Sequence, residues 1–222
     1  MKHIRIPHSR IDELRIEFDK HFPFFDDFQW QSNKYYFKKV FNIDQDSGIQ
    51  TARRRIHGPA TELVADSVKQ FGFDNVERCY MKFARGYLPI AMHVDVPAHD
   101  LKEDGWSIMI PLTFSNNIKT IAFTEKVTEP IFDYWIESQD WSARQKKNNL
   151  REKFNLENAY YLKPEIVDYM EVDGMGDWLK GNVFCFRRSH PHCSTNFRTL
   201  GLPFKDYIII QTDDRLNGSL RC

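Results

Sequence analysis

The sequence has few of the features that assign a chain to a class at once. It contains only four cysteines, Cys79, Cys185, Cys193 and Cys222, and no two of them form a Cys-x-x-Cys pair. Three of the four lie in or beside expected strands, where a reduced cysteine behaves as a small hydrophobic side chain. We therefore expect a protein without disulfides, for which a cytoplasmic location is the default.

Charge of one sign and long apolar runs are also missing. Lysine plus arginine and aspartate plus glutamate each number 31, so the net charge favours neither nucleic acid nor an anionic membrane as a partner. Short basic runs such as Arg53-Arg54-Arg55 are interpreted as solvated faces. No apolar run approaches the ~20 residues of a membrane span, and the N-terminal residues lack the apolar core of a signal peptide. We expect no nucleic-acid or membrane partner, and the oligomeric state is left open.

What the chain does have is size and aromatic content. Its 222 residues suit a single domain with a sizeable core, and its 18 Phe, 9 Tyr and 5 Trp suit a barrel with a deep pocket. Apolar residues at steps of three and four predict helices over 10–21, capped by Ser9, and over 60–71. Residues 1–75 are therefore expected to form a helical support within the domain 1–222.

From about residue 76 the apolar pattern switches to a period of two, which is typical of strands. Residues 106–114 alternate between two faces, and Pro111 indicates an edge or bulged strand. Residues 118–123 are interpreted as the returning strand of a hairpin. Further strands are expected at about 182–187, 192–198 and 206–212. Helices followed by many short strands predict an α+β, mainly β fold, an antiparallel barrel with the helices outside it.

Residues 125–180 follow neither pattern closely. A helix that starts near Ser138 and runs to about Phe154 is expected there, followed by loop or short strand up to Trp178. A long insertion between barrel strands often covers an active site. A lid over the site and a peripheral decoration both remain open.

Three residues stand out as candidate metal ligands. His93 and Asp95 are two apart on an expected strand, so their side chains point to the same face. His192 follows 99 residues after His93, a separation at which early and late strands of a barrel become neighbours. Two histidines and one carboxylate bind one face of an Fe(II) ion and leave its other positions open. His190 is the alternative to His192, which the proline immediately before it favours.

Two segments, roughly residues 75–115 and 180–213, resemble the 2-oxoglutarate/Fe(II)-dependent oxygenases. The first has a turn and a strand that lead into His93-Val94-Asp95. The second has Gly181-Asn182, an apolar strand, Phe186 and then His192 within a Pro-His-Cys-Ser-Thr-Asn run, similar to the Pro-His-Ala-Ala-x-Asn variant of small family members. The resemblance implies a double-stranded β-helix, a jelly-roll or cupin-like barrel, with a metal site of His93, Asp95 and His192.

The resemblance also implies two cofactors, Fe(II) and the co-substrate 2-oxoglutarate. In the family a basic residue after the distal histidine binds the distal carboxylate of 2-oxoglutarate. Lys205 and Arg198 are the candidates, and Lys205 is favoured because an inserted turn over residues 200–203 would delay the last strand. Tyr80 and Tyr87 are candidate hydroxyl donors to the co-substrate.

The implied activity is a dioxygenase reaction on a small molecule or a peptidyl side chain. Hydroxylation is favoured over halogenation, because halogenating members carry a small residue where this chain has Asp95. A cupin-like barrel that binds metal or ligand without oxidative turnover is the alternative, kept open by the irregular spacing of Arg198 and Lys205 after the distal histidine. An isomerase or hydrolase on the same barrel has only the shared metal ligands in its favour.

Overall fold

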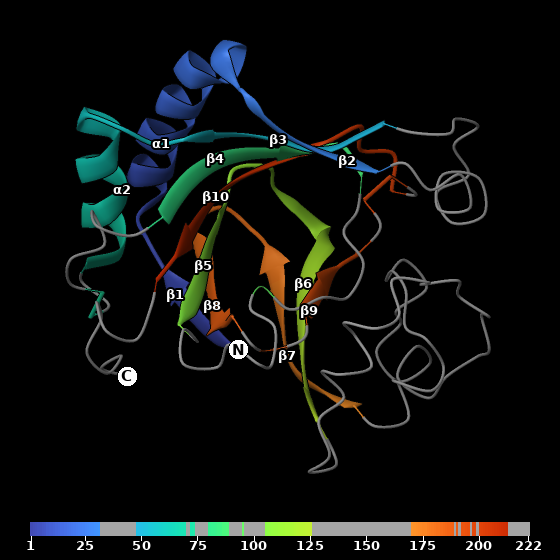
Figure 1. Cartoon of the computed structure of the whole chain (residues 1–222). Helices are drawn as coiled ribbons and strands as arrows, with labels where there is room; N and C mark the ends of the chain where they lie inside the picture. The colour runs from blue at the N-terminus through green and yellow to red at the C-terminus, as the bar shows by residue number, and fades with distance from the viewer. Residues whose placement is uncertain are drawn as a thin grey trace.

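The chain folds into two antiparallel β-sheets with two helices on one side (Figure 1). The structure is a computed structural model that describes residues 1–31, 48–69, 72–73, 80–88, 95, 105–125, 170–188, 190, 192–195, 197–198 and 200–212. The main sheet has seven strands in the order β1-β8-β5-β10-β4-β3-β2. The second sheet has three strands in the order β7-β6-β9.

Strands from distant parts of the chain alternate in the main sheet. Its members in chain order are β1 Lys2–Arg5, β2 Asp27–Gln31, β3 Gly48–Arg55, β4 Tyr80–Gly86, β5 Trp106–Pro111, β8 Asn182–Arg187 and β10 Lys205–Gln211. The second sheet comprises β6 Ser115–Glu125, β7 Met170–Trp178 and β9 His192–Ser194. The last strand, β10, lies between β4 and β5. Its antiparallel pairing with both neighbours fixes which of its residues point to each face of the sheet.

Two helices cover the outer face of the main sheet (Figure 1). Helix α1 spans His8–His21 and is followed by the 3-10 turn η1, Phe22–Phe24. Helix α2 spans Pro59–Lys69. Their apolar faces pack on outward-facing strand residues in one buried core, which includes Leu14, Phe18, Val64, Val68, Phe83, Ile108 and Ile208. Both expected helices are confirmed, but Pro7 rather than Ser9 precedes the first turn, with no side-chain capping bond.

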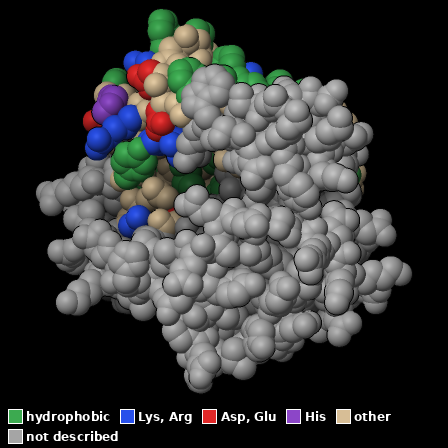
Figure 2. All heavy atoms as spheres, turned by 45° about the vertical axis from the view of Figure 1, so that its right-hand side comes forward, with side chains coloured by type: hydrophobic (Ala, Val, Ile, Leu, Met, Phe, Trp, Pro, Cys, Tyr) green, Lys and Arg blue, Asp and Glu red, His purple; other side chains and the backbone are tan. Residues whose placement is uncertain are grey.

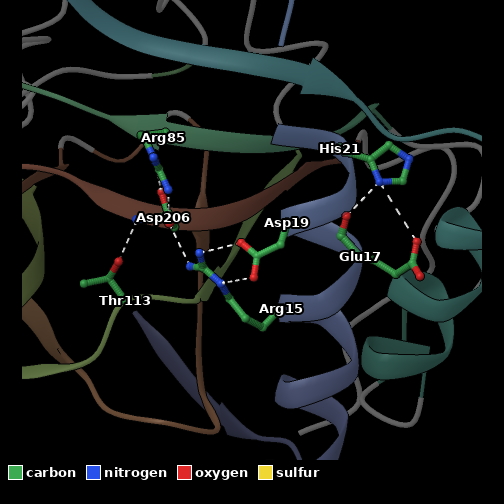
Figure 3. Close-up of polar contacts among 7 residues, drawn as sticks. All are labelled: Arg15, Glu17, Asp19, His21, Arg85, Thr113 and Asp206. Atoms are coloured by element: carbon green, nitrogen blue, oxygen red, sulfur yellow. Dashed lines mark hydrogen bonds and ion pairs between the residues drawn. The ribbon is translucent and has the colours of Figure 1, made fainter. Parts of the chain in front are cut away.

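A buried ion network ties α1 to the main sheet (Figure 3). The Asp206 carboxylate on β10 is fully buried and accepts two hydrogen bonds from Arg85 of β4, at 2.7 and 2.8 Å. Arg15 of α1 donates a third, at 2.7 Å. The Arg85 guanidinium lies 3.8 Å from the ring centroids of both Phe22 and Phe204. Because Asp206 points outward, strand alternation turns its neighbours on β10 inward.

A second core lies between the two sheets. It consists of inward-facing residues of both, namely Ala84, Met109, Ile118, Trp178, Phe184, Phe197 and Tyr207. The sheets approach closely at Gly176 of β7, where an added Cβ atom would overlap the ring of Phe184 on β8. The space for a ligand therefore has to lie beside these packed side chains, on the same inner face.

Two expectations about the strands are wrong. Residues 115–125 do not return beside 106–111 in a hairpin, because β5 and β6 belong to different sheets. The strand that ends at Pro111 is an interior strand, between β8 and β10. The proline is tolerated there because it is the last residue of β5.

The N-terminal part of the chain does more than support the barrel with helices. Residues 1–75 also supply β1, β2 and β3 to the main sheet. Of the expected insertion at 125–180, the structure describes Glu125 and 170–180, and 170–178 is strand β7 of the second sheet. The expected helix from Ser138 to Phe154, and with it the choice between lid and decoration, lies outside the described residues.

Two of the four cysteines can be placed. Cys185 and Cys193 are buried and are not joined in a disulfide, while Cys79 and Cys222 lie outside the described residues. On the side shown in Figure 2, lysine and arginine side chains are interspersed with aspartate and glutamate over the described surface. No helix within the described ranges is long and apolar enough to cross a membrane.

Candidate metal and co-substrate site

Asp95 is held in place from two directions. Its backbone N–H donates a 2.8 Å hydrogen bond to the carbonyl oxygen of Arg188, just after β8. Its carboxylate accepts a hydrogen bond on Oδ2 from the hydroxyl of Ser107, a fully buried residue on the inner face of β5. These contacts leave the second carboxylate oxygen, Oδ1, directed toward β9.

His192 meets Asp95 from the opposite sheet. The histidine opens β9 and is only 4% exposed, and its Nε2 lies 3.9 Å from Oδ1 of Asp95. Its Nδ1 lies 2.9 Å from the carbonyl oxygen of His190, and a carbonyl can only accept. In the neutral imidazole the proton is therefore on Nδ1, and Nε2 carries a lone pair on the side of Asp95. The Phe186 ring packs against the imidazole, with the ring centroids 4.3 Å apart.

The third expected ligand, His93, lies outside the described residues. Within the described part of the chain, no group of three His, Cys, Asp or Glu side chains is placed to hold a metal ion. The two that can be placed, Asp95 and His192, do come together. The backbone carbonyl oxygen of His190, the alternative distal ligand, lies 2.9 Å from Nδ1 of His192.

Lys205 is buried in a box of aromatic rings on the inner face of the main sheet. Its side chain is at the start of β10 and the residue is 3% exposed. The ammonium lies 4.6 Å from the ring centroid of Trp178, 5.5 Å from that of Phe197 and 5.7 Å from that of Tyr207. No carboxylate among the described residues forms an ion pair with it. Burial lowers the pKa of Lys205 to about 7, an effect that the nearby Cys193 thiol only partly opposes.

Arg198, the other candidate cation, points to solvent. It is exposed and donates a 2.7 Å hydrogen bond to the carbonyl oxygen of Pro203. The backbone around it forms a turn. The N–H of Gly201 donates a hydrogen bond to the carbonyl oxygen of Arg198, and the N–H of Leu202 donates one to that of Phe197. Gly201 has a φ of 79°. This turn is the expected insertion that delays the last strand, and it carries Arg198 on its outside.

Tyr207 links the two ends of the candidate site, and the sequence did not single it out. Burial raises the pKa of Tyr207 to about 12, which Arg53 and the Thr51 hydroxyl oppose and the Asp95 carboxylate reinforces. Both Arg53 and Asp95 therefore lie within electrostatic range of the Tyr207 hydroxyl. A tyrosine within an apolar strand carries no signal of this role, because the role depends on partners far away in the sequence.

The two tyrosines expected as hydroxyl donors differ in their surroundings. Tyr80, at the start of β4, is 38% exposed, and its ring contacts Arg55 and Lys82. Tyr87 is half-buried, and its backbone N–H bonds to the carbonyl oxygen of Gln50. Among the described residues neither hydroxyl forms a hydrogen bond with Lys205, so a role in co-substrate binding stays a prediction.

One buried polar group on β9 is also missing from the sequence-based prediction. The Ser194 hydroxyl, two residues after His192, is buried and has no hydrogen-bond partner among the described residues. Ser194 lies opposite Thr120 of β6, whose hydroxyl accepts a 2.9 Å bond from the indole of the box residue Trp178. A buried hydroxyl without a partner next to a candidate metal ligand marks a place where a polar ligand would be bound.

The chain matches no family model, and no curated protein matches it in sequence. In structure it is similar to the non-heme alpha ketoglutarate dependent carbocyclase SnoK from nogalamycin biosynthesis, with 9% identity, a TM-score of 0.53, and coverage of 95% of this chain and 78% of that chain. The epimerase SnoN from the same biosynthesis has 7% identity, a TM-score of 0.49, and coverage of 95% and 77%.

A prolyl-4-hydroxylase of Pseudomonas putida has 8% identity, a TM-score of 0.45, and coverage of 96% and 91%. At these identities the similarity to SnoK concerns the fold and not the reaction. It agrees with the two facing antiparallel sheets and with the approach of Asp95 and His192 between them. The chain therefore has the double-stranded β-helix fold of the 2-oxoglutarate/Fe(II)-dependent oxygenases, as the His-x-Asp and distal-histidine segments predict.

Proposed function

We propose that the protein is an Fe(II)/2-oxoglutarate-dependent dioxygenase that oxidises, by hydroxylation, a small molecule or a peptidyl side chain. His93, Asp95 and His192 would hold the metal, and Lys205 would bind the distal carboxylate of 2-oxoglutarate. The observation that carries the proposal is a buried lysine ammonium without a described carboxylate partner, which lies between the same two sheets as the His192–Asp95 pair.

The residues present fit a metal ion. The 3.9 Å between Nε2 of His192 and Oδ1 of Asp95 allows both atoms to contact one ion between them, because such bonds are about 2.0–2.2 Å long. The hydrogen bond from Nδ1 to the His190 carbonyl keeps the lone pair of His192 on Nε2. The hydroxyl of Ser107 fixes the rotation of the carboxylate. When bound, Fe(II) with 2-oxoglutarate would supply the activation of O₂ that oxidises a C–H bond.

Lys205 fits the distal carboxylate of the co-substrate for electrostatic reasons. A buried ammonium without an anion is unfavourable, and the lowered pKa of Lys205 expresses that cost. An incoming carboxylate would restore the charged form inside a low-dielectric site, where the interaction is stronger than in water. The rings of Trp178, Phe197 and Tyr207 would exclude water from the pair and keep the lysine from turning away.

The alternative, a cupin-like barrel without oxidative turnover, was motivated by the irregular spacing after the distal histidine. The turn around Gly201 accounts for that spacing, since it delays β10 and brings Lys205 to the inner face. The position of Lys205 supports the oxygenase over the alternative.

Anaerobic titration with Fe(II) and 2-oxoglutarate tests the proposal through the weak visible charge-transfer band of the ternary complex. We expect a band for the unmodified protein and none for Asp95→Ala, while Asp12→Ala, an exposed carboxylate of α1, keeps it. Lys205→Met should raise the 2-oxoglutarate requirement about tenfold or more, on the scale of a lost charged hydrogen bond of ~1.5–3 kcal/mol. Arg198→Met is its matched control and should change little.

Two results would count against the proposal. A larger effect of Arg198→Met than of Lys205→Met would show that the assigned cation is wrong. The absence of any band with the unmodified protein would reject the oxygenase function itself.

A further inference from the structure

Three basic side chains gather on the inner face of the main sheet, at its β3–β4 end. Arg53 and Arg55 of β3 lie directly opposite Ala84 and Lys82 of β4, so Arg53, Arg55 and Lys82 share one face. Asp27 of the edge strand β2 accepts hydrogen bonds from Lys82 and, at 3.1 Å, from Arg53. We call Arg53, Arg55 and Lys82 the basic cluster. The solvated face expected for residues 53–55 is thus wrong for Arg53.

The basic cluster has more positive charge than its surroundings neutralise. Burial acts to raise the pKa of Asp27, but the hydrogen bonds from Lys82 and Arg53 outweigh it and lower the pKa, so the carboxylate stays ionised. Among the described residues Arg55 has no ion pair, and the buried Nε of Arg53 has no hydrogen-bond partner. One carboxylate between three cations leaves a positive excess, with donors available for a further anion.

Tyr80 positions two members of the cluster, of which Arg55 is accessible from solvent. The Lys82 ammonium lies 4.4 Å from the centroid of the Tyr80 ring, and the Arg55 guanidinium lies 5.5 Å from it. The ring is 38% exposed and Arg55 is exposed, whereas Lys82 is 5% exposed. A solute can therefore reach the cluster from one side, while the protein backs it on the other. The ring of Tyr80 thus serves as a platform for cations.

The cluster adjoins the candidate metal site along the sheet. Tyr80 lies opposite Gln211 of β10, which lies opposite Ser107 of β5. The hydroxyl of Ser107 donates to the Asp95 carboxylate. Because neighbouring strands are about 4.8 Å apart, two strand spacings place Tyr80 about 10 Å from Ser107. Lys205 lies at the other end of β4, opposite Gly86, so the two cationic sites are separate.

We infer that the basic cluster binds an anionic group of the substrate, a phosphate or a carboxylate, on the same face of the main sheet as Ser107, whose hydroxyl holds Asp95. The identification of the anion as part of the substrate rests on the proposed function, but the anion site itself does not. An arginine with an exposed guanidinium and a second one with a buried, unused N–H are suited to the planar, forked hydrogen bonding of such groups. The protein would thus select acidic substrates over neutral ones of the same shape.

Calorimetric titration with three small probes tests this inference. Phenyl phosphate and benzoate carry the two anionic groups, and benzyl alcohol is the neutral control. Each is titrated into the full chain, first alone and then with saturating Mn(II), a redox-silent metal, and 2-oxoglutarate. The test variant is Arg55→Gln. Its matched control is Arg54→Gln, the next residue on the same strand, which points to the other face and lies 3.4 Å from Asp26.

We expect binding of at least one anionic probe and none of benzyl alcohol. Arg55→Gln should weaken that binding about fivefold or more, less than a fully buried charged contact because Arg55 is exposed, and Arg54→Gln should leave it within about twofold. Mn(II) and 2-oxoglutarate should not displace the probe. No binding by the unmodified protein, equal effects of the two variants, or displacement by 2-oxoglutarate would each overturn the inference.

The charge-transfer titration separates this inference from the proposed function. If no band forms but anion binding still depends on Arg55, the oxygenase function is rejected and the anion site stands. If the band forms and the anionic probes bind without dependence on Arg55, the oxygenase function stands and the anion site is rejected.

Discussion

At the scale of single residues, Lys205 shows how a buried charge costs stability. Its pKa is about 7 in the folded protein, against 10.5 for an ordinary lysine. Between these values the unfolded chain binds a proton that the folded chain does not. The burial of Lys205 therefore destabilises the folded protein to its full extent below pH 7, and this destabilisation decreases as the pH rises toward 10.5. The aromatic rings around Lys205 cannot neutralise its charge. An anionic ligand that does neutralise it would explain why the lysine is kept at such a cost.

Lys205→Met should consequently stabilise the ligand-free protein. At pH 6.5 we expect a gain of roughly 3–5 kcal/mol in the free energy of unfolding, on a scale of about 1.4 kcal/mol per pKa unit, and a much smaller gain at pH 10. Urea unfolding at the two pH values measures both gains, with Arg198→Met as the exposed control. A variant that is less stable than the unmodified protein at pH 6.5 would contradict the burial of an uncompensated charge.

The same ionisation should make co-substrate binding depend on pH. Above pH 7 the ligand-free Lys205 is mostly neutral and has to take up a proton to pair with a carboxylate. The apparent affinity for 2-oxoglutarate should then fall by up to about tenfold per pH unit between pH 7.5 and 9. Calorimetry in two buffers of different ionisation enthalpy, with Mn(II) bound, would show the proton uptake. Lys205→Met should show none of it, and uptake that persists in this variant would assign the effect to another group.

At the scale of elements, β10 carries opposite functions on its two faces. Lys205 and Tyr207 face the candidate site, while Asp206 between them joins the network with Arg15 and Arg85 (Figure 3). The outward ion pair therefore fixes the register that the inward residues need. Thr113 adds to it, because its hydroxyl accepts a 2.8 Å bond from the backbone N–H of Asp206.

Removing Asp206 should be far more damaging than removing its partner on α1. Asp206→Ala leaves the Arg85 guanidinium without its buried carboxylate, which costs about 3–5 kcal/mol in comparable buried pairs. Arg15 is partly exposed, so Arg15→Gln should cost only about 0–1 kcal/mol. Chemical unfolding of both variants measures the difference. Equal losses of stability would mean that the contact of α1 with Asp206 through Arg15 contributes as much as the β4–β10 contact through Arg85.

Local patterns predicted the elements better than their partners. The steps of three and four predicted α1 and α2 correctly, and the short apolar run within residues 182–187 predicted β8. The hairpin of β5 and β6 was wrong, because alternation identifies a strand but not the sheet that it joins. For the residues of β7 the sequence left loop and short strand open because of Gly174 and Gly176, whereas in the structure these glycines make room for a side chain of the other sheet and for the N-terminal residue.

At the scale of the whole molecule, the site exists only where the two sheets face each other. Asp95 could be paired with His192 from the sequence because both belong to recognisable segments. Arg53 and Tyr207 could not be assigned to the site from the sequence. Their positions there arise from neighbouring strands that are up to about 150 residues apart in the chain. His93 remains a prediction, since the structure does not describe it.

The spacing between the sheets should therefore be sensitive to a single methyl group. In Gly176→Ala the new Cβ would overlap the fully buried ring of Phe184, and overpacking of this kind costs about 1–3 kcal/mol. Phe184→Leu alone should also destabilise, by leaving a cavity. Because the second change makes room for the first, the double variant should lose less stability than the two single losses together. Urea unfolding of the four proteins measures the coupling, and strictly additive losses would show that the sheets do not meet at this pair.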